Sequence, residues 1–220
     1  MNKELAAISP IPIPQVLRKA IIEDVEFVVV NKMEGNQRQF IDCSPSILES
    51  FGKDLAIIHS RRFNECGNMG GAFRYPVTEF NKRLTQVLSE ITHRYDTDLQ
   101  ELSKYDEILQ GLLELPDPSD ASYVMVDFDA RQFLFSDDKI TAIVDTEAYV
   151  IGPRELDLIP LECSLDLERA IAFRRGYESI DAFPILHEIR RPYRYFFALL
   201  QVKGPMDYIQ WMNTPHYFDM

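Results

Sequence analysis

The order of hydrophobic and polar residues divides the chain into a short β-rich beginning and a longer, mainly helical remainder. Residues 15–22 and 26–31 are rich in β-branched residues and are separated by Glu23 and Asp24, which predicts two strands joined by a hairpin turn. Residues 27–30 read FVVV, a run too uniformly apolar for a strand that faces solvent. We therefore expect this strand to be covered.

Apolar residues at helical spacing predict helices over much of the rest of the chain. Ser44 followed by Pro45 is a strong helix start, and the apolar stripe behind it extends to about His59. Similar stripes predict helices over residues 80–95 and 99–113. The interpretation of His59 is a packed residue at a helix end rather than a catalyst.

Two further helices are predicted in the last third of the chain. Ser164 can cap a helix that Gly176 ends, and a stripe over residues 185–200 predicts another helix, kinked or interrupted at Pro192. Residues 64–73 contain GNMGG but follow a helix and lack the Lys-Ser/Thr ending of a phosphate-binding loop. We interpret them as an irregular surface loop.

Composition restricts the class of protein. A chain of 220 residues can bury a full core, no apolar run approaches the ~20 residues of a membrane helix, and the start shows no signal-peptide pattern. We expect a soluble cytoplasmic protein without a membrane partner. Its cysteines are too few and scattered for a disulfide framework or a metal site, so free thiols are expected. They are Cys43, Cys66 and Cys163.

A formal net charge of −12 argues against nucleic acid as a partner, because that binding needs clustered Lys and Arg. The charge suits a cationic small substrate, although many acidic cytosolic proteins use such a charge for solubility alone. Both interpretations stay open on composition.

Residues 123–158 carry the strongest candidate chemistry. Their pattern predicts a strand, a loop and then a hairpin in which residues 133–135 turn into residues 140–144. Asp127 leaves the first strand and Asp145 leaves the hairpin. Carboxylates at strand ends cost desolvation free energy unless they are paired or bind a cation, so two of them converging on one loop region indicate a site.

The spacing of these residues resembles the aminoglycoside phosphotransferase and choline kinase family. The catalytic loop of that family runs His-Gly-Asp, four residues, Asn, and a metal-binding Asp lies on the far strand of the following hairpin. Laid over this sequence, these positions fall on Asp127, Gln132 and Asp145. The family pattern Gly-Asp-Pro-x-x-Asp-Leu matches residues 152–158 in part and places its structural Asp on Asp157.

The resemblance covers most of the chain and implies an α+β, protein-kinase-like fold. A two-stranded remnant of the N-terminal lobe would occupy residues 1–35, and a mainly helical C-terminal lobe with an embedded catalytic β-hairpin would occupy residues 36–220. The family's proline-led strand, second strand, hinge and Leu-His-Ser helix end match residues 12–17, 27–30, 32–35 and 55–60.

The resemblance implies a small-molecule kinase that transfers the γ-phosphate of ATP to a substrate hydroxyl. Asp127 would orient or deprotonate that hydroxyl, Asp145 and Gln132 would hold Mg²⁺, and Asp157 would tie down the catalytic loop. Lys32, Met33 and Glu34 form the hinge implied to bind the nucleotide. Asp129 and Glu147, close by in the sequence, are additional candidates.

Departures from the family pattern motivate a second hypothesis. Met125 and Val126 replace His-Gly, Gln132 is one methylene longer than Asn, and no glycine-rich turn or strand lysine for the nucleotide phosphates precedes Pro12. We therefore expect phosphotransfer to be impaired or incomplete in this chain. The alternative is a catalytically inactive kinase-like binding or regulatory module, and a third reading is an unrelated helical scaffold protein. The sequence does not identify the acceptor.

Two strands without the rest of their sheet leave exposed edges that favour pairing with another chain. We therefore expect a partner chain, as in a homodimer, to cover residues 15–31, or a longer natural product to supply the missing strands.

Overall fold

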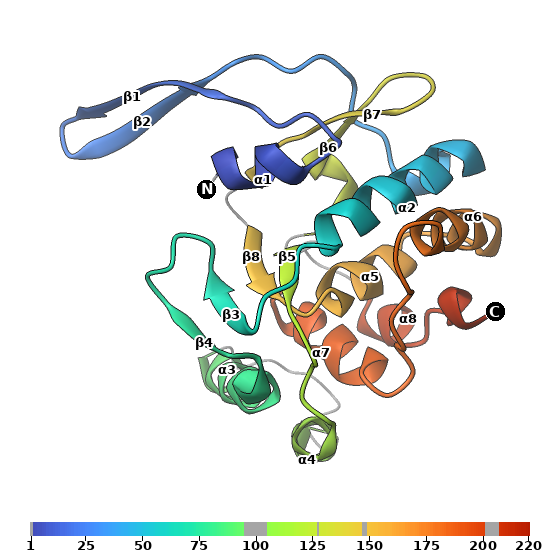
Figure 1. Cartoon of the computed structure of the whole chain (residues 1–220). Helices are drawn as coiled ribbons and strands as arrows, with labels where there is room; N and C mark the ends of the chain where they lie inside the picture. Colours follow the sequence, from blue (N-terminus) through green and yellow to red (C-terminus); the bar gives the residue numbers. More distant parts are fainter. Residues whose placement is uncertain (1, 95–104, 127, 147–148, 201–206) are drawn as a thin grey trace.

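The computed structural model describes residues 2–94, 105–126, 128–146, 149–200 and 207–220. The fold is α+β, as predicted, with small antiparallel sheets embedded among helices (Figure 1). One hairpin extends away from this body, and the helices of the C-terminal half pack together on the side of the body away from that hairpin (Figure 1).

The extended hairpin comprises β1 (Val16–Ile22) and β2 (Val25–Val30), close to the predicted strands. Glu23 and Asp24 form its turn with φ of 50° and 63°, a left-handed pair typical of a tight two-residue hairpin. Nothing in the described chain covers the FVVV run, and its cover by a partner chain stays a prediction. Its four side chains are 42–51% exposed because the hairpin projects from the body (Figure 1).

A four-stranded sheet lies inside the body in the order β4-β3-β8-β5. Its strands are β3 (Glu65–Asn68), β4 (Arg74–Pro76), β5 (Ser122–Met125) and β8 (Tyr149–Gly152). The predicted irregular loop over residues 64–73 is therefore wrong, because it contains a strand that pairs with β4 on one side and β8 on the other. Gly67 permits this pairing, since its φ is 130° and the carbonyl of Phe73 lies against its Cα.

Two more strands form the predicted hairpin, β6 (Phe133–Phe135) and β7 (Ile140–Ile143). This hairpin is bonded to both segments that flank the β1–β2 hairpin. Asn36 and Phe135 exchange two backbone hydrogen bonds of 2.9 Å, and the Ile143 N–H donates to the Pro12 carbonyl at 3.0 Å. The extended hairpin is thus attached to the body through β6 and β7.

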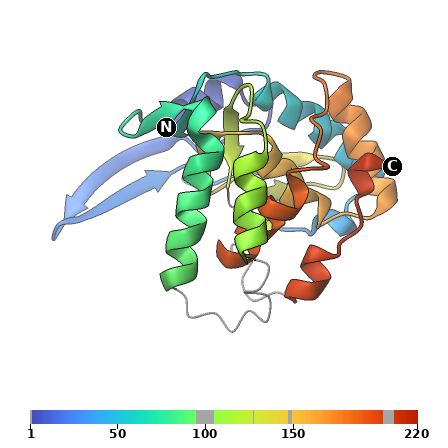
Figure 2. The same cartoon turned by 90° about the horizontal axis from the view of Figure 1, so that it is seen from below.

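The helices begin and end as follows: α1 (Asn2–Ile8), α2 (Pro45–His59), α3 (Phe80–Arg94), α4 (Tyr105–Glu114), α5 (Glu155–Glu162), α6 (Leu167–Glu178), α7 (Arg190–Leu200) and α8 (Tyr208–Met212). Ser44 caps α2 as predicted, its Oγ accepting from the Ile47 N–H at 3.4 Å. Helices α3 and α4 lie side by side (Figure 2). The predicted helical residues 95 and 99–104 lie outside the described residues.

Three details of the predicted C-terminal helices are wrong. Asp166, not Ser164, caps α6 by accepting from a backbone N–H three residues on. Gly176 does not end α6 but lies inside it. Glycine is needed there because α2 approaches too closely for a side chain. Pro192 does not kink α7, since the helix begins at Arg190 and proline is tolerated in a first turn, where no backbone N–H bond is lost.

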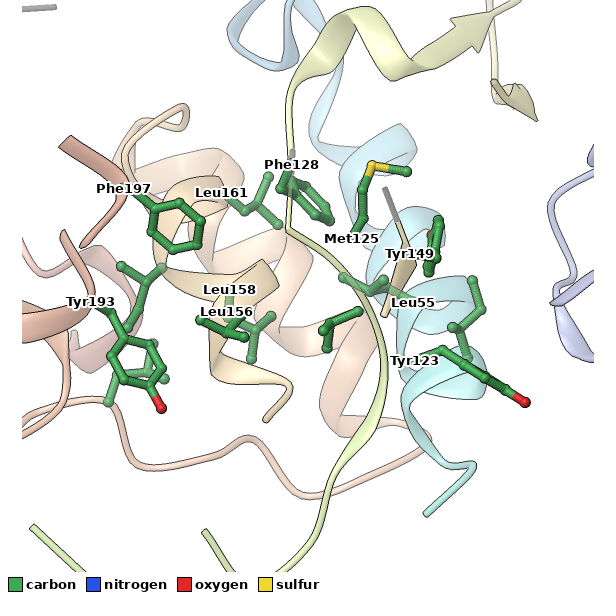
Figure 3. Packing of buried hydrophobic residues seen from close by; sticks show 14 of the residues in the cluster. Leu55, Tyr123, Met125, Phe128, Tyr149, Leu156, Leu158, Leu161, Tyr193 and Phe197 are labelled. Carbon is green, nitrogen blue, oxygen red and sulfur yellow. The ribbon is translucent and has the colours of Figure 1, made fainter. Parts of the chain in front are cut away.

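A single buried cluster joins the sheet to the helices. Figure 3 shows Met125 of β5 and Tyr149 of β8 beside Leu55 of α2, with Leu161 of α5 and Phe197 of α7 on the far side of the same cluster. The three cysteines are free, as predicted. None of the helices in the described parts of the chain is both long and apolar enough to cross a membrane.

Candidate active site

Asp157 is a fully buried carboxylate in the first turn of α5. Its Oδ1 accepts a hydrogen bond from the Met125 N–H at 2.8 Å, and its Oδ2 lies 3.2 Å from His59 Nε2. Met125 is the last residue of β5, two positions before Asp127. Asp157 therefore holds the strand end that leads into the predicted catalytic loop.

The hydrogen bonds continue from His59 to the protein surface. His59 Nδ1 lies 3.0 Å from the Tyr177 hydroxyl, which accepts from Arg154 at 3.5 Å. A neutral imidazole with its hydrogen on Nε2 satisfies every partner, donating to Asp157 and accepting from Tyr177. Burial, followed by the Arg154 and Arg62 charges, lowers the pKa of His59 well below its ordinary value. His59 is thus a packed helix-end residue, as predicted.

The two predicted metal ligands are brought together by a backbone hydrogen bond. Gln132 ends a 3-10 helix (Ala130–Gln132), and its carbonyl accepts from the Val144 N–H at 2.7 Å, which places it next to Asp145. Gln132 is 9% exposed, whereas Asp145 is exposed to solvent. Asp145 also has a φ of 55°, a left-handed conformation that costs a non-glycine residue roughly 1–2 kcal/mol. Strain of this kind concentrates at functional sites.

The other predicted residues are divided between described and undescribed parts. Asp127 and Glu147 lie outside the described residues. Asp129 caps the 3-10 helix, with its Oδ1 accepting from the Arg131 N–H at 2.8 Å and from Arg131 Nε at 3.0 Å. These bonds fix Asp129 at the start of the turn that carries Gln132.

A cavity of about 1020 Å³ lies between α1, the β1–β2 hairpin and Asp145. Val28 and Val30 contribute apolar surface, while Asp145, Lys3 and Lys19 contribute charge. No strand lysine for the nucleotide phosphates precedes Pro12, but Lys19 lies beyond it, on β1 directly opposite Val28. Lys19 lies within the first predicted strand and faces the second one, and this pairing is the sequence signal that could have identified it as a lysine of the site.

The predicted hinge residues follow β2 directly but do not line this cavity. Lys32 and Glu34 are exposed and form a 3.6 Å ion pair. The Glu34 carbonyl accepts from the Thr141 hydroxyl of β7 at 2.7 Å. Together with Met33, these residues connect the extended hairpin to β7, and their role in nucleotide binding stays a prediction.

A second cavity of about 520 Å³ adjoins the predicted catalytic loop. Asp129 and Ala130 line it from the loop, Ile41 from the segment before α2, and Trp211 from α8. Trp211 also packs within the protein, since it is 8% exposed and its Nε1–H donates to the Arg194 carbonyl at 2.8 Å.

No group of three or more His, Cys, Asp or Glu residues suited to a metal ion occurs among the residues the structure describes, which exclude Asp127 and Glu147. The Asp145 carboxylate and the Gln132 amide nevertheless offer hard oxygen donors. Mg²⁺ typically binds protein through one or two such groups and keeps water or substrate phosphates as its other ligands. The donor types therefore fit Mg²⁺.

Comparison of the chain with solved structures finds phosphotransferases. The chain superposes on a macrolide 2'-phosphotransferase of Brachybacterium faecium with a TM-score of 0.65 and 14% identity, covering 97% of this chain and 78% of that one. For the GDP complex of an aminoglycoside 2'-phosphotransferase-IIIa variant the values are 0.66, 17%, 92% and 70%. For a protein assigned as a fructosamine-3-kinase of Thermobifida fusca they are 0.66, 20%, 96% and 74%.

Sequence comparisons give no such match, since no protein-family model matches the chain and no curated protein does. The similarity is therefore one of structure, and it extends over nearly the whole chain. This is the fold that the resemblance to the aminoglycoside phosphotransferase and choline kinase family implied. The chain has the protein-kinase-like fold of the aminoglycoside and macrolide phosphotransferases.

Proposed function

We propose that the protein is a small-molecule kinase that transfers the γ-phosphate of Mg-ATP to a hydroxyl group. The observation that carries this proposal is the position of Asp145. This residue has a left-handed backbone conformation and lines the 1020 Å³ cavity together with two lysines. A cavity of this size accommodates a nucleotide. The phosphotransferase fold supports the assignment of this cavity to the nucleotide.

Each part of the cavity has a role in this proposal. Val28 and Val30 offer an apolar surface to the base, and Lys3 and Lys19 neutralise phosphate charge. Asp145 and Gln132 would hold Mg²⁺, which when bound neutralises charge on the transferred phosphoryl group. Phosphoryl transfer requires mainly positioning and charge neutralisation, and these residues supply both.

The acceptor would occupy the second cavity, beside the loop that carries Asp127 and Asp129. In the proposal Asp127 orients the attacking hydroxyl and receives its proton. Trp211 offers an apolar face against which a ring can pack, and Asp129 offers a carboxylate. Asp157 acts only through backbone, because it holds Met125 and thereby the start of the loop.

The experiment that tests the nucleotide site is a calorimetric titration of Mg-ATP into the wild type and Asp145→Asn. Loss of one charged metal ligand should weaken binding by about tenfold or more. Asp137→Asn is the matched control, since Asp137 is a fully exposed aspartate in the β6–β7 turn. Equal affinity of the wild type and Asp145→Asn would contradict the proposed metal role.

A second candidate function is a catalytically inactive kinase-like binding module. Met125 favours it, because this residue stands where the family has histidine and is fully buried in the hydrophobic cluster rather than bracing a loop. Phosphoryl transfer to any hydroxylated small molecule, abolished by Asp127→Ala, would exclude this candidate. Nucleotide binding without transfer would favour it.

A further inference from the structure

We propose that a pocket between α7 and α8 binds a small oxyanion, the phosphate or carboxylate group of a metabolite. The pocket has a volume of about 330 Å³, which is enough for such a group and a small attached moiety. Arg190, Arg191, Arg194, His187 and His216 line it. The inference does not depend on the proposed kinase function.

The charge around the pocket is locally positive although the whole protein has a formal charge of −12. Glu162 is fully buried and contacts Arg190 and Arg194 at 2.8 and 2.9 Å, and Asp219 contacts Arg190 at 2.8 Å. These two carboxylates balance two of the three arginines.

Arg191 supplies the remaining positive charge of the pocket. Its contact with Glu107 is 3.8 Å long and joins two exposed side chains, an arrangement that contributes little. The charges of Arg190 and Arg194, after burial, lower the pKa of His216, which reports the same positive potential. An anion entering the pocket would therefore meet an excess of positive charge.

Arg194 provides a second, independent indication. It is 1% exposed, and its Nη1 and Nη2 groups donate to the Thr214 carbonyl at 2.6 Å and to Glu162 at 2.9 Å. Its buried Nε–H, in contrast, has no acceptor among the residues the structure describes. A buried donor without an acceptor costs roughly 1–3 kcal/mol, so an oxyanion that accepts this hydrogen bond gains affinity.

The pocket is separate from both cavities of the candidate active site. Helix α8 contributes Tyr208 and Met212 to the pocket and Trp211 to the second cavity. The indole N–H of Trp211 donates to the backbone carbonyl of Arg194, a residue of the pocket wall. Trp211 is the only tryptophan in the sequence, so its fluorescence reports on α8, which borders both the pocket and the second cavity.

The test is a titration with inorganic phosphate and, separately, with succinate, at constant ionic strength maintained by chloride. Trp211 fluorescence and calorimetry follow binding. We expect saturable binding of at least one of the two anions. Binding of phosphate would indicate a phosphate group as the ligand, and binding of succinate a carboxylate group. Arg191→Gln should weaken that binding about tenfold, the effect of one lost charged hydrogen bond.

Two controls keep the result interpretable. Arg83→Gln removes a comparably exposed arginine from α3, remote from the pocket, and should bind as the wild type does. Asp145→Asn should also bind the anion normally, which separates this pocket from the nucleotide cavity. Absence of saturable binding of either anion, or equal binding by wild type and Arg191→Gln, would overturn the inference.

Discussion

A buried carboxylate is tolerated in a protein only when its oxygens have partners, and Asp157 has them. Its two oxygens contact the Met125 N–H and His59 Nε2, and burial raises its pKa well above the ordinary value. These two contacts offset part of the free energy lost when the group is buried. They also fix the course of the chain between β5 and the predicted catalytic loop. We infer that Asp157 is a positioning residue.

Replacement of Asp157 tests this role. Asp157→Ala leaves the Met125 N–H and His59 without their buried partner, so the free energy of unfolding should fall by about 3 kcal/mol. Asp157→Asn keeps an acceptor for the Met125 N–H and removes the buried charge, so its loss should be clearly smaller. Urea denaturation measures both variants. Equal losses for alanine and asparagine would argue against the hydrogen bond as the stabilising contact.

Residue identities at the candidate site were partly predictable. The family resemblance singled out Asp145 and Asp157, because motifs record which residue types recur at a fixed distance along the chain, and the roles assigned to both residues stay predictions. The positive φ of Asp145 and the place of Lys19 in the cavity did not follow. The place of Lys19 depends on where the extended hairpin lies relative to α1 and Asp145, a long-range relation that a local sequence pattern does not contain.

At the scale of elements, α2 and α6 cross at two glycines. A Cβ atom on Gly52 would meet the carbonyl oxygen of Phe173, and one on Gly176 would meet the carbonyl oxygen of Glu49. The two backbones are thus in direct contact. The sequence alone suggested a helix end at Gly176, because a glycine near the end of an apolar stripe most often caps a helix.

A substitution distinguishes the crossing from a cap. Gly176→Ala should lower the free energy of unfolding by about 1–3 kcal/mol, since the helices must separate to admit a methyl group. Gly111→Ala is the matched control, because Gly111 lies in α4 with no atom near its missing Cβ. That control should gain up to about 1 kcal/mol from helix propensity. Denaturation curves that show Gly176→Ala as stable as the wild type would contradict the close crossing.

Long helices and the β1–β2 hairpin were predicted well because their patterns extend over several residues, whereas the short β6–β7 hairpin was recognised by the turn residues 136–139 between its strands. Strands β3 and β4 were missed because they are four and three residues long, with glycine at position 67. Such short strands are fixed by pairing, β4 with β3 and β3 with β8, and not by their own pattern.

The whole molecule presents the β1–β2 hairpin to solvent on both faces. Its exposed apolar residues include Ile21 at 75% and Leu17 at 65%, and in the described chain neither strand pairs with any other. Strand β2 reads VEFVVV, so two copies of it could pair antiparallel about Val28 without like charges opposite one another. We propose that a second copy of the chain pairs with this strand.

Sedimentation analysis tests this proposal. The wild type should form dimers, and the double variant Phe27→Thr/Val29→Thr should be monomeric, because threonine keeps β-propensity but removes apolar surface. Val87→Thr on α3 is the control, since Val87 is exposed to a similar degree at 42%. A wild type that stays monomeric at high concentration would exclude the dimer.

The backbone hydrogen bonds that attach the extended hairpin to β6 and β7 affect how that hairpin can move. The chain enters that hairpin from Pro12, which is bonded to Ile143 of β7, and leaves it through Asn36, which is bonded to Phe135 of β6. Asp145 follows β7 by two residues. We expect a movement of the extended hairpin that changes the width of the 1020 Å³ cavity to be transmitted to the β6–β7 hairpin. The width of this cavity and the direction of the Asp145 carboxylate would then change together.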